Sequence, residues 1–151
     1  MKKLIKLCTA VLAVVTLLAF AGCSARSPIT ADEFTKQAKA QGFTVKEATS
    51  SNTDVDKYLT ATKDETGTEL VFISFKTDAA AESLYTSLKK SISDGTTVAG
   101  KALDSATYNK YTLVNGELSH TLARMNTTIV YGKATSVHQN QVDDFFKVIK
   151  Y

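Results

Sequence analysis

A short apolar run near the N-terminus decides which residues of this chain are left to fold. Residues 7–22 carry no charge and are mostly apolar, and Lys2, Lys3 and Lys6 precede them. A helix that spans a bilayer needs about 20 apolar residues, so this run is short for a membrane span. A positive start, an apolar middle and small residues at the exit are typical of a cleaved export signal. We therefore expect the folded part to begin after Gly22.

The exit of this run, Phe20-Ala21-Gly22-Cys23, resembles the lipobox of bacterial lipoproteins, although that family prefers leucine where Phe20 stands. The resemblance implies that residues 1–22 are a signal peptide and that the Cys23 thiol receives a diacylglyceryl group. It also implies acyl chains such as palmitate and a location at the extracytoplasmic face of the cell membrane. Each buried methylene contributes about 0.8 kcal/mol, so two or three acyl chains make a persistent anchor.

Two other outcomes of processing remain open. Ala19-Phe20-Ala21 also fits the A-x-A cleavage site of ordinary secretion, which would release a chain cut after Ala21 with Cys23 unmodified. An uncleaved leader would instead be retained as an anchor.

Loss of the leader changes the charge and the thiol content of the chain. The full sequence has 18 lysine and arginine residues against 15 aspartate and glutamate residues, and three of the lysines lie in the leader. The remaining chain is formally neutral, which counts against nucleic acid as a partner, because that needs a concentrated basic surface. Cys8 leaves with the leader and Cys23 is alkylated, so an exported fold must be held by its core without a disulfide.

After the leader, residues 23–28 are expected to be the lipidated N-terminus and a short spacer, and residues 29–151 a single α+β domain. The domain begins at a capping box, Thr30 to Glu33, and Gly42 is expected to end this first helix. A second helix is expected between Asp78 and Gly95.

A third helix is expected from a second capping box, Ser136 to Gln139, with its apolar face at Val142, Phe145, Phe146 and Ile149. Expected strands run over residues 43–47, 58–64, 69–76, 97–103, 108–114, 117–125 and 127–134. Asn115-Gly116 predicts a type I′ hairpin turn. The expected fold is an antiparallel sheet built from hairpins, with about three amphipathic helices packed on one face.

The whole chain resembles the small lipoproteins of Gram-positive-type bacteria, in which a lipobox precedes a compact α+β domain. The matching segments are residues 30–34, the strand with Lys110 and Tyr111, the turn at Asn126, and residues 145–151. This resemblance implies no activity and no site residues.

Three residues are candidates for ligand binding. His120 and Arg124 lie on one face of an expected strand, where they can meet an anionic ligand. The alternative for His120 is a residue at the flank of the sheet with its nitrogens bonded locally. Tyr111 belongs to a set of strand tyrosines. These form either a binding surface or the edge of a core, with their hydroxyl groups in contact with water.

We find no catalytic, cofactor-binding or metal-binding set in the sequence. Neither histidine has a second histidine or a cysteine three or four residues away, as zinc spacing requires. Asp54 and Asp56 lie in a loop that has too few oxygen ligands for calcium. Nucleophile elbows and phosphate loops are absent from the sequence as well.

These observations favour a membrane-anchored, extracytoplasmic lipoprotein with a non-catalytic binding domain, whose ligand is a small molecule or an envelope protein. The alternatives are an envelope hydrolase whose site is assembled from dispersed residues, and a structural or assembly protein. A pocket that collects His120, Arg124 and a carboxylate would favour the enzyme, whereas an open sheet face or an apolar groove would favour binding.

Overall fold

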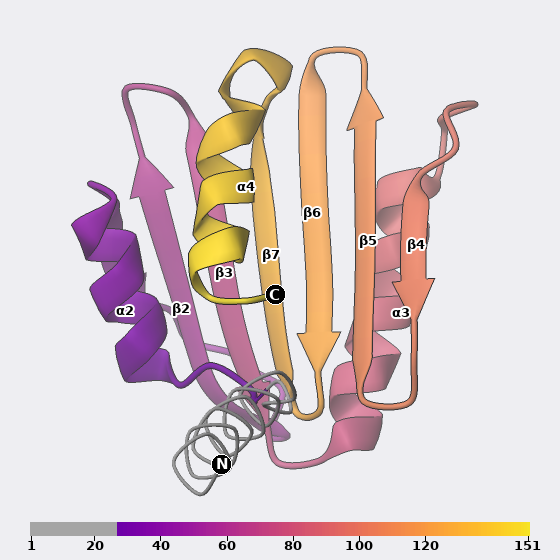
Figure 1. Ribbon diagram of the computed structural model, residues 1–151. Coiled ribbons are helices and arrows are strands. Elements are labelled where there is room, and N and C mark those ends of the chain that lie inside the picture. The colour runs from indigo at the N-terminus through magenta and orange to yellow at the C-terminus, as the bar shows by residue number, and fades with distance from the viewer. Residues whose placement is uncertain (1–26) are drawn as a thin grey trace, which may run out of the picture.

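The computed structural model describes residues 27–151, so the leader and Cys23 lie outside the described residues. The described elements follow in chain order (Figure 1). They are α2 (Ala31–Ala40), β1 (Thr44–Glu47), β2 (Val55–Lys63), β3 (Thr68–Phe75), α3 (Asp78–Ser93), β4 (Lys101–Asp104), β5 (Tyr108–Asn115), β6 (Leu118–Met125), β7 (Thr128–Thr135), a short 3₁₀ helix (Ser136–His138) and α4 (Gln139–Val148).

The strands form one seven-stranded sheet in the order β1-β2-β3-β7-β6-β5-β4, within the described part of the chain. All neighbouring strands pair antiparallel, and β7 lies at the centre. The predicted α+β fold with an antiparallel sheet and three helices is confirmed. The continuous apolar run of β3 is confirmed as an inner strand, since β2 and β7 pair with its two sides. The edge strands β1 and β4 have only four residues each.

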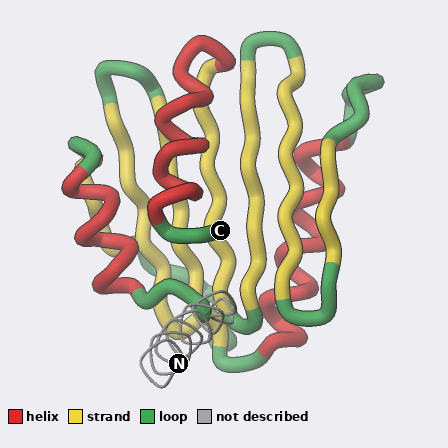
Figure 2. The backbone as a smooth tube through the Cα atoms, viewed as in Figure 1, coloured by secondary structure: helices red, strands yellow, loops and turns green. Residues whose placement is uncertain are grey.

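The prediction that the helices pack on one face is wrong, because α2 and α4 cover one face and α3 lies behind the other (Figures 1 and 2). We call these sides the α4 face and the α3 face. Side chains alternate between the two faces of a strand, and β3 carries apolar side chains on both of its faces. Leu70 and Phe72 pack with the α4 core, whereas Ile73 and Phe75 pack with the α3 core. Two apolar faces require helices on both sides.

The α4 core is built around aromatic rings. Phe145 is fully buried, and its ring centroid lies 5.3 Å from that of Phe34 on α2 and 6.5 Å from that of Phe43. At Gly132 of β7, any Cβ atom would lie 2.4 Å from Val142 Cγ1. Glycine therefore lets α4 approach the backbone of the central strand.

The predicted helix ends are confirmed in part. Thr30 Oγ1 accepts a hydrogen bond from the Glu33 amide at 3.2 Å, and Gly42 follows the first helix with φ = 82°. The sequence offers Asp78 as the cap of the second helix, but Thr77 caps it, because the Thr77 hydroxyl accepts the Ala80 amide at 3.3 Å.

Two local predictions in the second half are wrong. The capping box at Ser136 does not form; a 3₁₀ turn precedes α4 and its caps make no side-chain hydrogen bond. In the β5–β6 hairpin, Asn115 pairs with Leu118, so Gly116 and Glu117 are the turn residues. Only Gly116 has a positive φ, 59°, whereas a type I′ turn needs two positive values.

Candidate functional site

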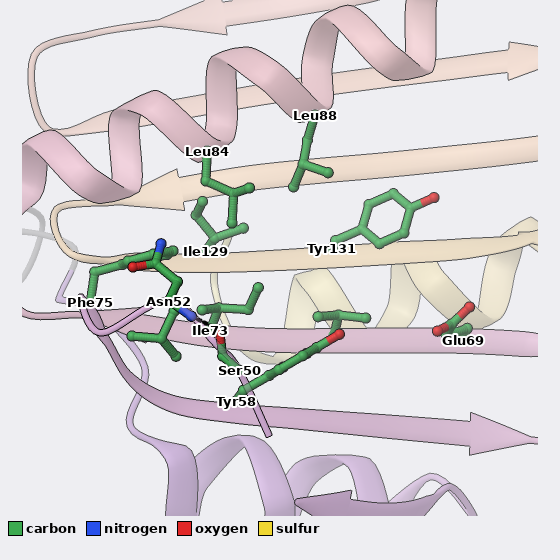
Figure 3. Close-up of a pocket in the computed structure, with 12 residues that line it drawn as sticks. Ser50, Asn52, Tyr58, Glu69, Ile73, Phe75, Leu84, Leu88, Ile129 and Tyr131 are labelled. Carbon is green, nitrogen blue, oxygen red and sulfur yellow. Dashed lines mark hydrogen bonds between the residues drawn. The ribbon is translucent and has the colours of Figure 1, made fainter. Parts of the chain in front are cut away.

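Helix α3 leaves part of its sheet face uncovered, and the uncovered part forms a groove of about 430 Å³. We call it the α3 groove. Its floor comes from β2, β3 and β7, one wall comes from α3, and the loop before β2 closes one end (Figure 3). The apolar lining includes Val55, Val71, Ile73, Leu84, Leu88 and Ile129. The polar lining is Ser50, Asn52, Tyr58, Glu69 and Tyr131.

The groove follows directly from the spacing of residues in β3 and α3. Val71 and Ile73 are two residues apart in a strand, so they lie on the same face. Leu84 and Leu88 are four residues apart in a helix, so they lie one above the other over this floor (Figure 3). Val71, Leu84 and Leu88 are half-buried, which leaves apolar surface in contact with water.

The two ends of the groove differ in chemistry. Glu69 is the only charged residue of its lining, and it lies at the end opposite Asn52 and Phe75 (Figure 3). At the Asn52 end, short bonds within the loop hold the polar groups: Asn52 Oδ1 accepts the Asp54 amide at 2.9 Å, and Ser50 Oγ accepts the Asn52 amide at 3.1 Å.

A second hollow of about 290 Å³ adjoins the groove beneath the last turns of α3. Leu88 and Tyr131 line both hollows, and His120 and Lys133 line the second. His120 Nδ1 and Tyr131 Oη are 2.8 Å apart, and the two rings are stacked with centroids 6.1 Å apart.

Burial favours the uncharged form of both residues of the His120–Tyr131 pair. Burial, with Lys133 nearby, lowers the pKa of His120 from its ordinary value of 6.5. Burial, with Glu69 nearby, raises the pKa of Tyr131 to about 12. The charges at this end of the groove therefore come from Glu69 and Lys133.

The three predicted ligand-binding residues share the α3 face of the sheet, but their side chains have different surroundings and contacts. His120 lines the hollow beside the groove. The Tyr111 ring is buried against Gly100, where an added Cβ would lie 2.3 Å from the ring, and Lys89 Nζ lies 5.5 Å from its centroid.

The guanidinium of Arg124 is bound to the protein itself. Its Nε donates to Asn109 Oδ1 at 2.7 Å, its Nη2 donates to the Ala106 carbonyl at 3.1 Å, and its Nη1 donates to the Asn126 carbonyl at 3.4 Å. Only 3% of Arg124 is exposed. These bonds connect the β4–β5 loop and the β6–β7 turn to β6. Arg124 therefore has a structural role in the sheet.

Sequence reasoning missed the partner of His120, and it also missed Glu69 and Lys133. Lys133 pairs across the sheet with His120 on one side and with Glu69 on the other. Only the register of β3, β7 and β6 brings these residues together, so the signal lies in strand pairing and in no local motif.

Residues 27–151 contain neither a metal-ligand cluster nor a helix that could span a membrane. No group of three or more histidine, cysteine, aspartate or glutamate residues in this range is placed to hold a metal ion. None of the helices in the same range has the length and apolar character needed to cross a membrane.

Comparison with known proteins identifies the fold and no family. No protein-family model matches the chain, and no curated protein matches its sequence. The crystal structure of a GTP binding regulator from Thermotoga maritima superposes with a TM-score of 0.52, over 80% of this chain and 87% of that one. The two sequences are 16% identical, so the likeness extends to the fold alone.

Proposed function

We propose that this chain is a lipid-anchored domain at the extracytoplasmic face of the cell membrane, and that it binds a ligand in the α3 groove without catalysing a reaction. The anchoring half of the proposal rests on residues 1–22 and on the lipobox that ends at Cys23. The binding half rests on the groove.

The observation that carries the binding half is a preformed, mostly apolar groove with a few polar groups at its ends. Ligand pockets in proteins typically have volumes of about 300–1,000 Å³ and this kind of lining. The α3 groove has a volume of about 430 Å³. Leu84 and Leu88 lie over an apolar floor that no other element of residues 27–151 covers, and this arrangement suits an apolar ligand.

Nucleotide binding is not part of the proposal, although the structural neighbour is a GTP binding regulator. Phosphate groups are usually held by arginine, lysine and helix N-termini. The lining of the α3 groove contains one carboxylate, Glu69, and neither lysine nor arginine, and the adjoining hollow adds a single lysine, Lys133.

The groove is tested with the neutral apolar dye Nile red and the full chain. We expect the protein to bind the dye, and Val71→Glu to weaken binding about tenfold, because a charge must then be buried against the dye. Leu88→Glu, which alters the wall rather than the floor, is expected to have the same effect. Fluorescence titration measures both.

Val148→Glu is the matched control, since Val148 lies on α4 and is 49% exposed. It is expected to leave dye binding unchanged. Equal binding by all four proteins would remove the groove as the binding surface, and melting temperatures measured in parallel show whether each variant is folded.

The anchor is tested by intact-mass analysis of protein extracted from membranes. We expect a chain that begins at Cys23 and carries a diacylglyceryl group, and we expect Cys23→Ala to lose both the cleavage and the lipid. An unmodified chain beginning at Gly22, or one that keeps Lys2 and Lys3, would contradict this half of the proposal.

A further inference from the structure

The α3 groove and the hollow beside it adjoin each other. Leu88 and Tyr131 line both, so the Tyr131 end of the apolar floor lies next to the residues around His120 and Lys133. A ligand that fills the groove therefore reaches a polar end.

That polar end carries two opposite charges side by side. Glu69 on β3 and Lys133 on β7 are directly paired across the strands, and their side chains lie on the α3 face. Opposed residues in an antiparallel pair have Cα atoms about 5 Å apart. Among the described residues, neither side chain takes part in a hydrogen bond or an ion pair. Both charges are thus available to a ligand that itself carries a positive and a negative group.

The floor next to these charges is long and apolar. Val71, Ile73 and Phe75 follow Glu69 at every second position of β3. With a rise of about 3.3 Å per residue, the row from Glu69 to Phe75 is about 20 Å long. This shape fits a single extended hydrocarbon chain.

The backbone beneath this row distinguishes an acyl chain from a peptide. Both edges of β3 are already paired, with β2 and with β7. An extended peptide laid on this floor would find no backbone partners for its own amides and carbonyls, and such unpaired groups are costly. A hydrocarbon chain has no such groups.

We propose that the ligand of the α3 groove is a single-chain zwitterionic amphiphile. Its cationic group lies at Glu69, its anionic group lies at Lys133, and its chain extends over Val71 and Ile73 beneath Leu84 and Leu88. This inference rests on the proposed function, because it names the ligand class of the same groove.

The test compares two twelve-carbon amphiphiles below their micelle concentrations, dodecylphosphocholine and dodecyl maltoside. They share the chain and differ in the headgroup, which is zwitterionic in the first and uncharged in the second. Equilibrium dialysis is carried out with the full chain, kept in solution by an amphipathic polymer. We expect the wild type to bind dodecylphosphocholine about tenfold more tightly than dodecyl maltoside, because only the first makes charge-assisted contacts.

Charge variants then locate the headgroup. Glu69→Lys is expected to weaken dodecylphosphocholine binding about tenfold and to leave dodecyl maltoside binding within about twofold. The double variant Glu69→Lys with Lys133→Glu restores one charge of each sign, and it is expected to recover most of the lost affinity. Asp144→Lys makes the same charge change on an exposed part of α4, over the opposite face, and is the matched control.

The outcomes separate this inference from the proposed function. Equal affinity of the wild type for the two amphiphiles would overturn the zwitterion assignment and leave the groove as a binding surface. Binding of neither amphiphile, together with no binding of Nile red, would overturn both.

Discussion

Replacing Phe145 by alanine is expected to lower the free energy of unfolding by about 3–5 kcal/mol, the usual cost of removing a buried phenylalanine. Phe145 is fully buried, and its ring meets Phe34 of α2 at 5.3 Å and Phe146 at 6.3 Å between centroids. The cavity would therefore open where α2, α4 and the sheet meet. Small domains are stable by about 5–15 kcal/mol, so the variant is expected to be near its stability limit.

Urea unfolding followed by circular dichroism measures this loss. Val148→Ala is the matched control, because Val148 lies on the same helix and is 49% exposed. We expect this control to change the free energy of unfolding by no more than about 0.5 kcal/mol. A Phe145→Ala variant as stable as the control would contradict the packing of α4 described above.

Arg124→Ala is expected to lower the free energy of unfolding by about 3 kcal/mol. The substitution removes the donor to Asn109 Oδ1 and to the carbonyls of Ala106 and Asn126. Buried polar groups that lose their partner cost about 1–3 kcal/mol each. The loss extends further, because Asn109 Nδ2 donates to Asp104 Oδ1 at 3.1 Å, and Lys89 of α3 pairs with Asp104 Oδ2 at 3.2 Å.

Lys133→Ala is the control for Arg124, since it removes a cation from the same sheet face without breaking a hydrogen bond of the described residues. Its expected effect on unfolding is within about 0.5 kcal/mol. Urea unfolding and Nile red titration of Arg124→Ala together decide between two roles of Arg124. Unchanged stability with impaired dye binding would favour the ligand-binding role predicted from the sequence.

The helices and strands were largely predictable because their signals are local. The capping box at Thr30, the glycine at position 42 and the apolar face of α4 each depend on residues close together in the chain. The distribution of helices over two faces was not predictable in this way. It depends on which strands become neighbours, and α3 connects β3 to β4 at the far edge of the sheet.

The candidate site depends even more on which strands become neighbours, and local sequence signals do not predict this. Placing His120 on a strand required only the alternation of β6, but its hydrogen bond to Tyr131 and its position beside Lys133 depend on the β6–β7 register. The sequence predicts Arg124 as a ligand contact because it shares a strand face with His120, where both can meet an anionic ligand. Its three acceptors lie on β5 and in two loops, and no sequence motif links them to it.

The short edges of the sheet have a consequence for how the molecule behaves beside copies of itself. An exposed strand edge invites pairing with another chain, and long apolar edges lead to fibrous aggregates. Here β1 and β4 have four residues each, and each contains one lysine and one acidic residue. A neighbouring strand would gain few backbone bonds there and would have to accommodate charge. Both edges of the sheet therefore disfavour pairing with a strand of another copy, even at high protein concentration.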